Sequence, residues 1–101
     1  MDIQKLMKQA QEMQAGMQKT QEELAAKTVE ATAGGGKVTV VANGAGDVIS
    51  INIDASVVDP EDTEFLQSLV LSGVQDAIAK GKEMAASEMS KLTGGMGLPG
   101  M

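Results

Sequence analysis

The sequence contains no cysteine, histidine, tryptophan or tyrosine, and Phe65 is its only aromatic residue. Without cysteine there are no disulfides and no thiolate nucleophiles or metal ligands. Without histidine the chain lacks the commonest general base, so no hydroxyl or carboxylate has a suitable base beside it. We therefore expect no catalytic site and no metal site with thiolate or imidazole ligands.

Arginine and long apolar runs are also missing. Without arginine, the chain cannot make the bidentate contact to guanine that most often specifies a DNA sequence. No stretch of about 18 apolar residues is present to span a membrane, and no apolar run follows a basic start as in a signal peptide. We expect a cytoplasmic protein with no membrane partner.

The residues that remain allow a core, but an adaptable one. Of 101 residues, enough for one domain, 43% are hydrophobic, and methionine, alanine, valine, isoleucine and leucine must do the packing. Methionine fills irregular gaps but specifies a single packing poorly. With so little aromatic area, a chain of this size is a weak candidate for a stable monomer.

The net charge of −6 is unevenly distributed. In residues 1–27 four lysines balance four carboxylates, and in residues 66–101 three lysines balance three. The whole deficit lies in residues 28–65, where Lys37 is outnumbered by seven carboxylates. Overall attraction therefore cannot bring this chain to a polyanion, and any such binding must use local positive faces.

Residues 2–26 are predicted to form a long amphipathic helix. Asp2 can cap its start, and Gly16 is its weakest position, costing about 1 kcal/mol relative to alanine. Small or apolar residues recur every three or four positions, which is a heptad pattern: Ile3, Leu6, Ala10, Met13, Met17, Thr20 and Leu24.

Three stretches of alternating residues follow and predict strands at 28–33, 38–42 and 48–53. Gly34-Gly35-Gly36 supplies the first turn, and Asn43-Gly44, the strongest short hairpin motif, opens the second. Such short turns join neighbouring strands into an antiparallel meander. The glycine triplet is not a phosphate-binding loop, because Val38 stands where that motif needs serine or threonine and a strand follows it.

Asp59-Pro60-Glu61 predicts the start of a second long helix, which runs to about Lys91, and a break near residue 63 stays open. The nearby carboxylates lack the order of calcium ligands, so a solvated helix start explains them. Residues 94–101 are predicted to be a disordered glycine- and methionine-rich tail on a single domain of residues 1–93. Small residues at every fourth position predict a close approach by the sheet or another helix: Gly73, Ala77, Gly81 and Ala85.

The predicted fold is α+β, with a long N-terminal helix, a three-stranded antiparallel sheet and a long C-terminal helix. At 1.5 Å per residue the helices reach about 36 and 45 Å, more than a compact domain with a radius of gyration of about 13 Å can cover. Their apolar seams would be exposed, and a second copy is the simplest cover. The candidate dimer interface is Ile3, Leu6, Ala10, Met13, Met17 and Leu24.

Lysines are the candidate contacts to a nucleic acid. Lys5, Lys8 and Lys19 fall opposite the apolar seam of the first helix. Solubility explains lysines at these positions as well as contact with a phosphate backbone does. The full candidate set of DNA-binding residues is Lys5, Lys8, Lys19, Lys27, Lys80, Lys82 and Lys91.

A set of short motifs runs along nearly the whole chain: Leu6-Met7-Lys8-Gln9-Ala10-Gln11, Gln21-Glu22-Glu23-Leu24, Asn43-Gly44, Ile51-Asn52-Ile53-Asp54, Asp59-Pro60-Glu61-Asp62 and the stretch from Gly94 to Met101. Together they resemble the YbaB/EbfC family of bacterial nucleoid-associated DNA-binding proteins. The resemblance implies a homodimer with a joined central sheet and projecting helices, binding to double-stranded DNA and a nucleoid location. It implies neither cofactor nor catalysis.

Two functions stay open. In the first, the chain is a nucleoid-associated protein that binds duplex DNA as a homodimer, mainly through backbone and shape contacts, with roles in nucleoid organisation and gene regulation. Without arginine, its discrimination between sequences should be modest. In the second, favoured by the acidic middle, it is an interaction module whose helical seam binds a recombination, repair or replication factor.

Overall fold

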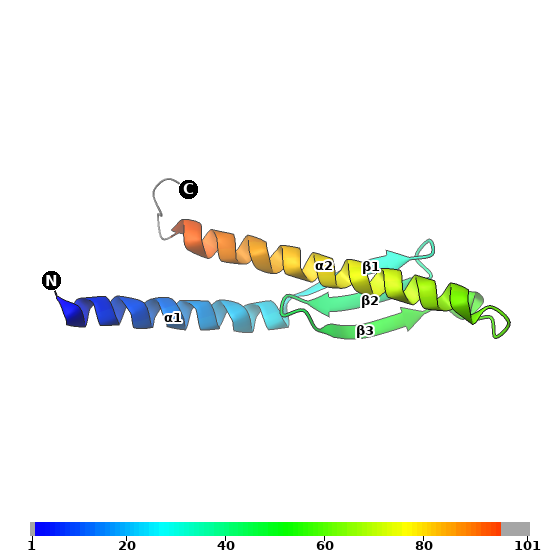
Figure 1. Cartoon of the computed structure of the whole chain (residues 1–101), viewed down its shortest axis with the longest axis horizontal. Coiled ribbons are helices and arrows are strands. Elements are labelled where there is room, and N and C mark those ends of the chain that lie inside the picture. Colours follow the sequence, from blue (N-terminus) through cyan, green and yellow to red (C-terminus); the bar gives the residue numbers. More distant parts are fainter. Residues whose placement is uncertain (1, 96–101) are drawn as a thin grey trace.

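The computed structural model describes residues 2–95 and consists of two long helices and a sheet (Figure 1). In chain order the elements are helix α1 (Ile3–Ala26), strands β1 (Thr28–Ala33), β2 (Val38–Asn43) and β3 (Val48–Ile53), the 3-10 helix η1 (Ala55–Val57) and helix α2 (Thr63–Gly95). This is the predicted α+β fold, and the strand boundaries match within one residue. None of the described helices is both long and apolar enough to cross a membrane.

Helix α1 has the start and end that the sequence predicts. The carboxylate of Asp2 accepts a hydrogen bond from the backbone N of Lys5 at 3.3 Å, which satisfies one free N–H of the first turn. The helix ends at Ala26, because Lys27 takes an extended backbone conformation while its N still donates to the carbonyl of Glu23. Of its 24 residues only Leu24 is buried, so most of the helix is free of the rest of the chain.

The sheet is an antiparallel meander in the order β1-β2-β3. Ala31 pairs with Val40, and Val40 pairs with Ile51, so these three side chains share one face. The turn between β1 and β2 needs a left-handed backbone, and the φ angles of Gly34, Gly35 and Gly36 are 63°, 66° and 90°. Glycine adopts these angles without steric cost, which explains the triplet at this place.

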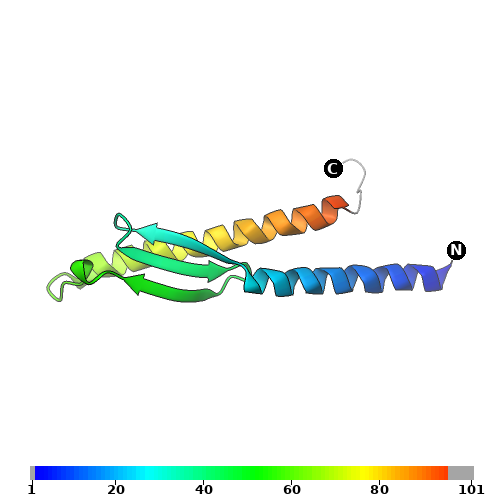
Figure 2. The same ribbon diagram turned by 180° about the vertical axis from the view of Figure 1, so that it is seen from behind.

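Helix α2 lies across β1 and β2 on that face (Figures 1 and 2). A β-carbon added to Gly73 would stand 2.9 Å from Cγ2 of Val40, so the absent side chain lets the helix rest directly on the sheet. One turn later Ala77 is fully buried. The predicted close approach is confirmed, and it creates a core of Ala31, Val38, Val40, Ala42 and Ala77.

The second helix begins later than predicted. Asp59 closes a separate turn, in which its Oδ1 accepts from the backbone N of Glu61 at 2.9 Å and its carbonyl accepts from Asp62 N at 3.0 Å. The helix cap is Asp62, whose Oδ1 accepts from the backbone N of Phe65 at 3.3 Å. The predicted start at Asp59 was wrong. Asp59 and Asp62 both carry the side-chain oxygen that a helix cap requires, so the sequence does not show which of them begins the helix.

The far end of α2 also passes the predicted boundary. The helix reaches Gly95, whereas the tail was expected to begin at Gly94. Assignments of helix ends commonly differ by one or two residues. The rest of the predicted tail, residues 96–101, lies outside the described residues.

The molecule is elongated, with principal extents of 71 × 25 × 16 Å. Its radius of gyration is 19.6 Å, against about 13 Å for a compact domain of 100 residues. The excess comes from α1 and the C-terminal half of α2, which extend from the same end of the sheet, as Figures 1 and 2 show. The predicted projection of the helices beyond the body is therefore confirmed.

Candidate nucleic-acid interface

The direction of α1 is set at its junction with the sheet. Leu24 is only 4% exposed, and a β-carbon at Gly44 would come within 2.8 Å of its Cδ2. The backbone N of Gly44 donates to the carbonyl of Leu24 at 2.9 Å. The β2–β3 turn thus packs on the last turn of α1 and holds the root of the helix against the sheet.

Asn43 completes this junction with a buried amide. Its Nδ2 donates to the carbonyl of Ala25 at 3.1 Å, which ties the end of α1 to β2. Its Oδ1 accepts from the backbone N of Ala45 at 3.0 Å and of Asp47 at 2.9 Å. The side chain of Asn43 therefore bonds both to the last turn of α1 and to the backbone of the hairpin turn. The Asn-Gly turn thus also anchors α1 to the sheet.

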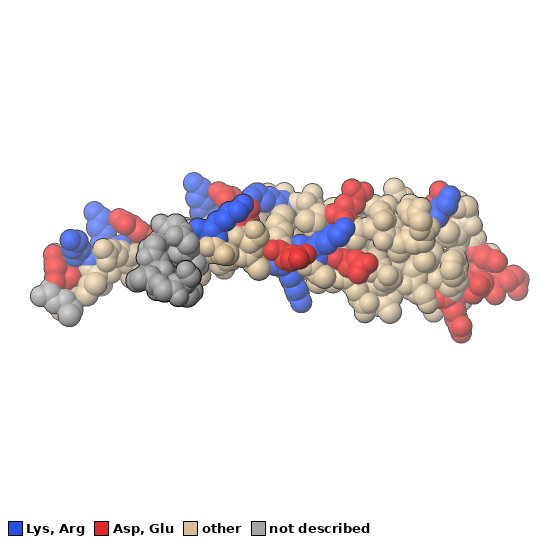
Figure 3. Space-filling view, turned by 90° about the horizontal axis from the view of Figure 1, so that it is seen from above, with Lys and Arg blue, Asp and Glu red and all other residues tan. Residues whose placement is uncertain are grey.

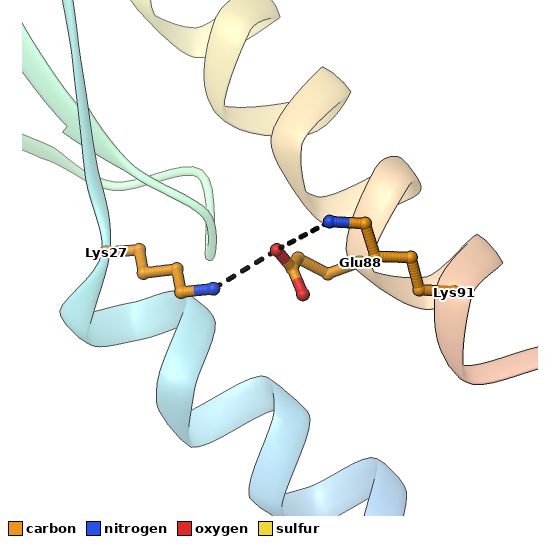
Figure 4. A network of polar contacts seen from close by, with 3 residues as sticks. All are labelled: Lys27, Glu88 and Lys91. Atoms are coloured by element: carbon orange, nitrogen blue, oxygen red, sulfur yellow. Dashed lines mark hydrogen bonds and ion pairs between the residues drawn. The ribbon is translucent and has the colours of Figure 1, made fainter. Parts of the chain in front are cut away.

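A small ion network links α1 to α2 just beyond this junction (Figure 4). Lys27 Nζ lies 3.1 Å from Oε1 of Glu88, and Lys91 Nζ lies 3.9 Å from the same oxygen. The hydrogen bond and charge of Lys27, with the charge of Lys91, lower the pKa of Glu88 below its ordinary value. Two of the predicted DNA-binding lysines are thus partly occupied by a carboxylate of their own chain.

The seven candidate lysines divide into two groups. Lys27 and Lys91 pair with Glu88, and Lys80 donates to the carbonyl of Glu30 at 3.0 Å. The other four are exposed and have no ion pair or hydrogen bond to any residue from 2 to 95: Lys5, Lys8, Lys19 and Lys82. Only this second group is fully free to meet a phosphate.

The lysines of α1 do not form a purely positive face. Glu12 follows Lys8 by four residues and Glu23 follows Lys19 by four, which places each carboxylate one turn along the same side of the helix. Figure 3 shows the same mixture, with blue and red side chains alternating along the helical end. Long-range attraction is therefore weak, and these lysines act only at contact distance.

Carboxylates gather at the opposite end of the molecule (Figure 3). The loop and first turn of α2 bring together Asp59, Glu61, Asp62 and Glu64. Nearby, hydrogen bonds from the backbone and side chain of Ser56, and then the charge of Lys37, lower the pKa of Asp54. This end repels phosphates, so any surface that binds a nucleic acid must lie toward the projecting helices.

The predicted dimer seam of α1 is exposed in the single chain. Ile3, Leu6 and Met13 are 68%, 50% and 46% exposed. The seam borders an open groove of about 670 Å³ between α1 and the end of α2, lined by Leu6, Gln9, Ala10, Glu12, Met13, Gly16 and Leu92. Leu24 differs from the others, because it is buried within its own chain and belongs to the junction described above.

A second apolar surface was not identified from the sequence. Helix α2 covers β1 and β2 but leaves β3 exposed along its length, with Ile51 and Ile53 on the face that the helix occupies. The adjacent flank of α2 is also apolar and forms a groove lined by Leu66, Gln67, Val70, Leu71 and Val74. The alternating residues of β3 predict that one face of the strand is buried. They do not show whether this chain or a second molecule buries it.

The fold and the site define an elongated α+β chain that presents free lysines on a projecting helix. A crystal structure of an uncharacterized protein from Helicobacter pylori has the same fold, with a TM-score of 0.72 and 26% sequence identity. The match covers 95% of this chain and 97% of that one. The chain belongs to the YbaB/EbfC DNA-binding family, which it matches over residues 1–96.

Curated relatives of the chain are named nucleoid-associated proteins. One from Acetivibrio thermocellus is 54% identical over 101 residues, which cover 99% of this chain and 89% of the relative. Another from Akkermansia muciniphila is 54% identical over 99 residues, or 98% of this chain and 95% of the relative. The chain is accordingly a DNA-binding protein and not an enzyme, as the sequence predicted.

Proposed function

We propose that the chain acts in the bacterial nucleoid as a homodimer that binds duplex DNA through its projecting helices, mainly by backbone contacts, with roles in nucleoid organisation and gene regulation. The observation that carries the proposal is the position of the free lysines. In a member of a DNA-binding family, Lys5, Lys8 and Lys19 lie unpaired on a helix that has one buried residue.

The proposed dimer joins two sheets through β3. An edge strand presents unpaired backbone groups that can bond to another strand, and both faces of β3 are exposed. The apolar side chains of β3 and of the neighbouring α2 flank would be covered by the same contact: Val48, Ile51, Ile53, Leu66, Val70, Leu71 and Val74. The α1 seam stays a second predicted contact between copies.

Binding to DNA is proposed to be short-range and dominated by the backbone. The net charge of −6 and the acidic end oppose distant attraction. Lysine ammonium groups contact phosphates as point charges, and Lys82 adds a free lysine on α2. A dimer would double this set and hold two such surfaces against one duplex.

The test is a titration of a labelled duplex of unrelated sequence with the full chain. Fluorescence anisotropy reports binding, and the titration is repeated at salt concentrations between about 50 and 200 mM. If about four to six phosphates are neutralised, log affinity should fall with log salt with a slope of roughly −4 to −5. Absence of binding at about 50 mM salt, where backbone contacts are strongest, would overturn the proposal.

The alternative function has one specific observation in its favour. Phe65 and Val58, each 51% exposed, lie near the carboxylates of the acidic end. Apolar side chains ringed by charge are typical of a surface that binds another protein. This surface lies away from the free lysines of α1 and differs from the helical seam to which the sequence assigned the alternative; a basic protein partner from recombination, repair or replication would bind there.

A further inference from the structure

Helix α1 carries a line of glutamines distinct from both its apolar seam and its lysines. Gln4, Gln11 and Gln18 are seven residues apart, so each turns only about 20° from the previous one around the helix. They lie about 10.5 Å apart along its axis. All three are exposed, and their amides bond to no residue within the described part of the chain.

We propose that this glutamine ridge, defined as Gln4, Gln11 and Gln18, enters the DNA major groove and contacts the edges of adenine bases. The inference rests on the proposed function, since it assigns base contacts to the helix whose lysines contact the backbone. The ridge is the specificity-determining part of α1, and the lysines supply affinity.

The chemistry of the amide selects this ligand. A glutamine side chain donates and accepts at once, which matches the N6 donor and N7 acceptor that adenine presents in the major groove. The chain has no arginine, and its lysines can donate to guanine but cannot accept, so amides are its only long side chains that match a donor–acceptor pair on a base edge. A phosphate only accepts hydrogen bonds, so it would engage the NH2 group of a glutamine and leave the carbonyl oxygen unused. Adenine engages both the NH2 group and the carbonyl oxygen.

The position of α1 allows the contact. An α-helix with side chains is about 10–12 Å across, and the major groove is about 12 Å wide. Nearly all of α1 is free of the body, so its surface can approach a duplex without unfolding any contact. Lys8 and Lys19 lie about 60–100° around the helix from the ridge, on the side where a groove wall would bring phosphates.

The remaining faces of α1 are less suited to DNA. The lysine face alternates with carboxylates such as Glu12 and Glu23, which would lie against acceptors of the bases and the backbone. The apolar seam borders the groove toward α2. The ridge residues themselves are uncharged, and the one carboxylate on their line, Glu22, lies a turn beyond Gln18, next to the junction with the sheet.

The experiment compares the full-length parent with Gln4→Ala/Gln11→Ala/Gln18→Ala. Three labelled duplexes of equal length are used at one low salt concentration: one A·T-rich, one G·C-rich, and the A·T-rich sequence with 7-deazaadenine. The last probe removes the major-groove N7 acceptor but leaves the charge and the minor groove unchanged. Alanine favours helix more than glutamine does, so the variant should fold; far-ultraviolet circular dichroism checks this.

The matched control is Gln9→Ala. Gln9 belongs to the same helix but lies about 160° around it from Gln11, where it lines the groove toward α2. The parent should prefer the A·T-rich duplex by at least about fivefold, the lower end for one bidentate amide–adenine contact. The ridge variant and the deaza probe should each reduce this preference to within about twofold, whereas Gln9→Ala should keep it.

The outcomes separate the two claims. A parent that binds DNA without preference, or a ridge variant that keeps the preference, overturns the glutamine ridge and leaves the proposed function standing. A preference that survives 7-deazaadenine also overturns it and assigns recognition to the minor groove. If the parent binds none of the duplexes, the proposed function itself fails. The salt slope of the ridge variant should match that of the parent, because no charge was removed.

Discussion

Gly81 of α2 lies directly against the backbone carbonyl of Asn43: a β-carbon at position 81 would stand 2.5 Å from that oxygen. The oxygen cannot move away easily, because it accepts from the backbone N of Gly46 at 3.2 Å and belongs to the residue that anchors α1. Helix α2, the hairpin turn and the root of α1 therefore meet at one point, which sets where the two helices separate.

Replacing Gly81 by alanine is expected to destabilise the fold. Because the added methyl group would stand 2.5 Å from a backbone oxygen, the forced shift should cost near the upper end of about 1–3 kcal/mol, more than the gain of about 1 kcal/mol from helix propensity. Thermal unfolding should show a lower Tm, by about 4–8 °C for each kcal/mol lost. Gly16→Ala is the matched control, since a β-carbon there meets nothing within 4 Å; it should raise the Tm. A stable Gly81→Ala protein would contradict the close approach.

Ile51→Asp is expected to dissociate the proposed dimer. Burying an unpaired carboxylate between copies costs several kcal/mol, so light scattering should report a mass near 10.4 kDa, the mass of one chain, instead of twice that value. Asn52→Asp adds a charge to the opposite face of the same strand and should leave the dimer intact. Leu6→Asp/Met13→Asp examines the α1 seam in the same way. If only that variant dissociates, the interface lies on the helices and not on β3.

Charge reversal on α1 is expected to remove DNA binding. Lys5→Glu/Lys8→Glu/Lys19→Glu should lower affinity by at least about tenfold at low salt and flatten the salt slope, because each lost phosphate contact removes about 0.9 from it. The single variants Lys8→Glu and Lys37→Glu separate position from net charge, since both lower the charge by the same amount. Lys37 pairs with Asp54 away from α1 at 3.8 Å. Equal loss in both single variants would mean that only overall charge matters.

Glu88→Gln is expected to lower stability at neutral pH but not in acid. The network with Lys27 and Lys91 lowers the pKa of Glu88 in the folded protein. The contribution of the carboxylate is thus fully present above its unfolded pKa and is lost as the pH falls through the lower folded pKa. The difference in Tm between parent and variant should shrink along that pH range and in high salt. Glu83→Gln, at an exposed position of the same helix, removes the same charge and serves as the control for net charge.

Much of the local structure was predictable because it depends on neighbouring residues. The heptad spacing and the Asp2 cap defined α1, and the glycine triplet and Asn43-Gly44 defined the turns of the meander. The start of α2 was not predictable, since Asp59 and Asp62 have the same capping chemistry. The candidate lysines were found by residue type, but the partners of Lys27, Lys80 and Lys91 come from segments far away in the chain.

By itself the sequence determined the order and type of the elements, the absence of catalytic groups, the uneven charge and the family. These follow from periodicity, composition and short motifs, which act over a few residues. Only the tertiary structure decided which strand is uncovered and which lysines are free. Helix α2 can rest on the sheet only where Gly73, Ala77 and Gly81 let it approach, and this contact places it over β1 and β2. The width of one helix then leaves the residues of β3 exposed, because α2 contacts β3 far less than it contacts β1 and β2.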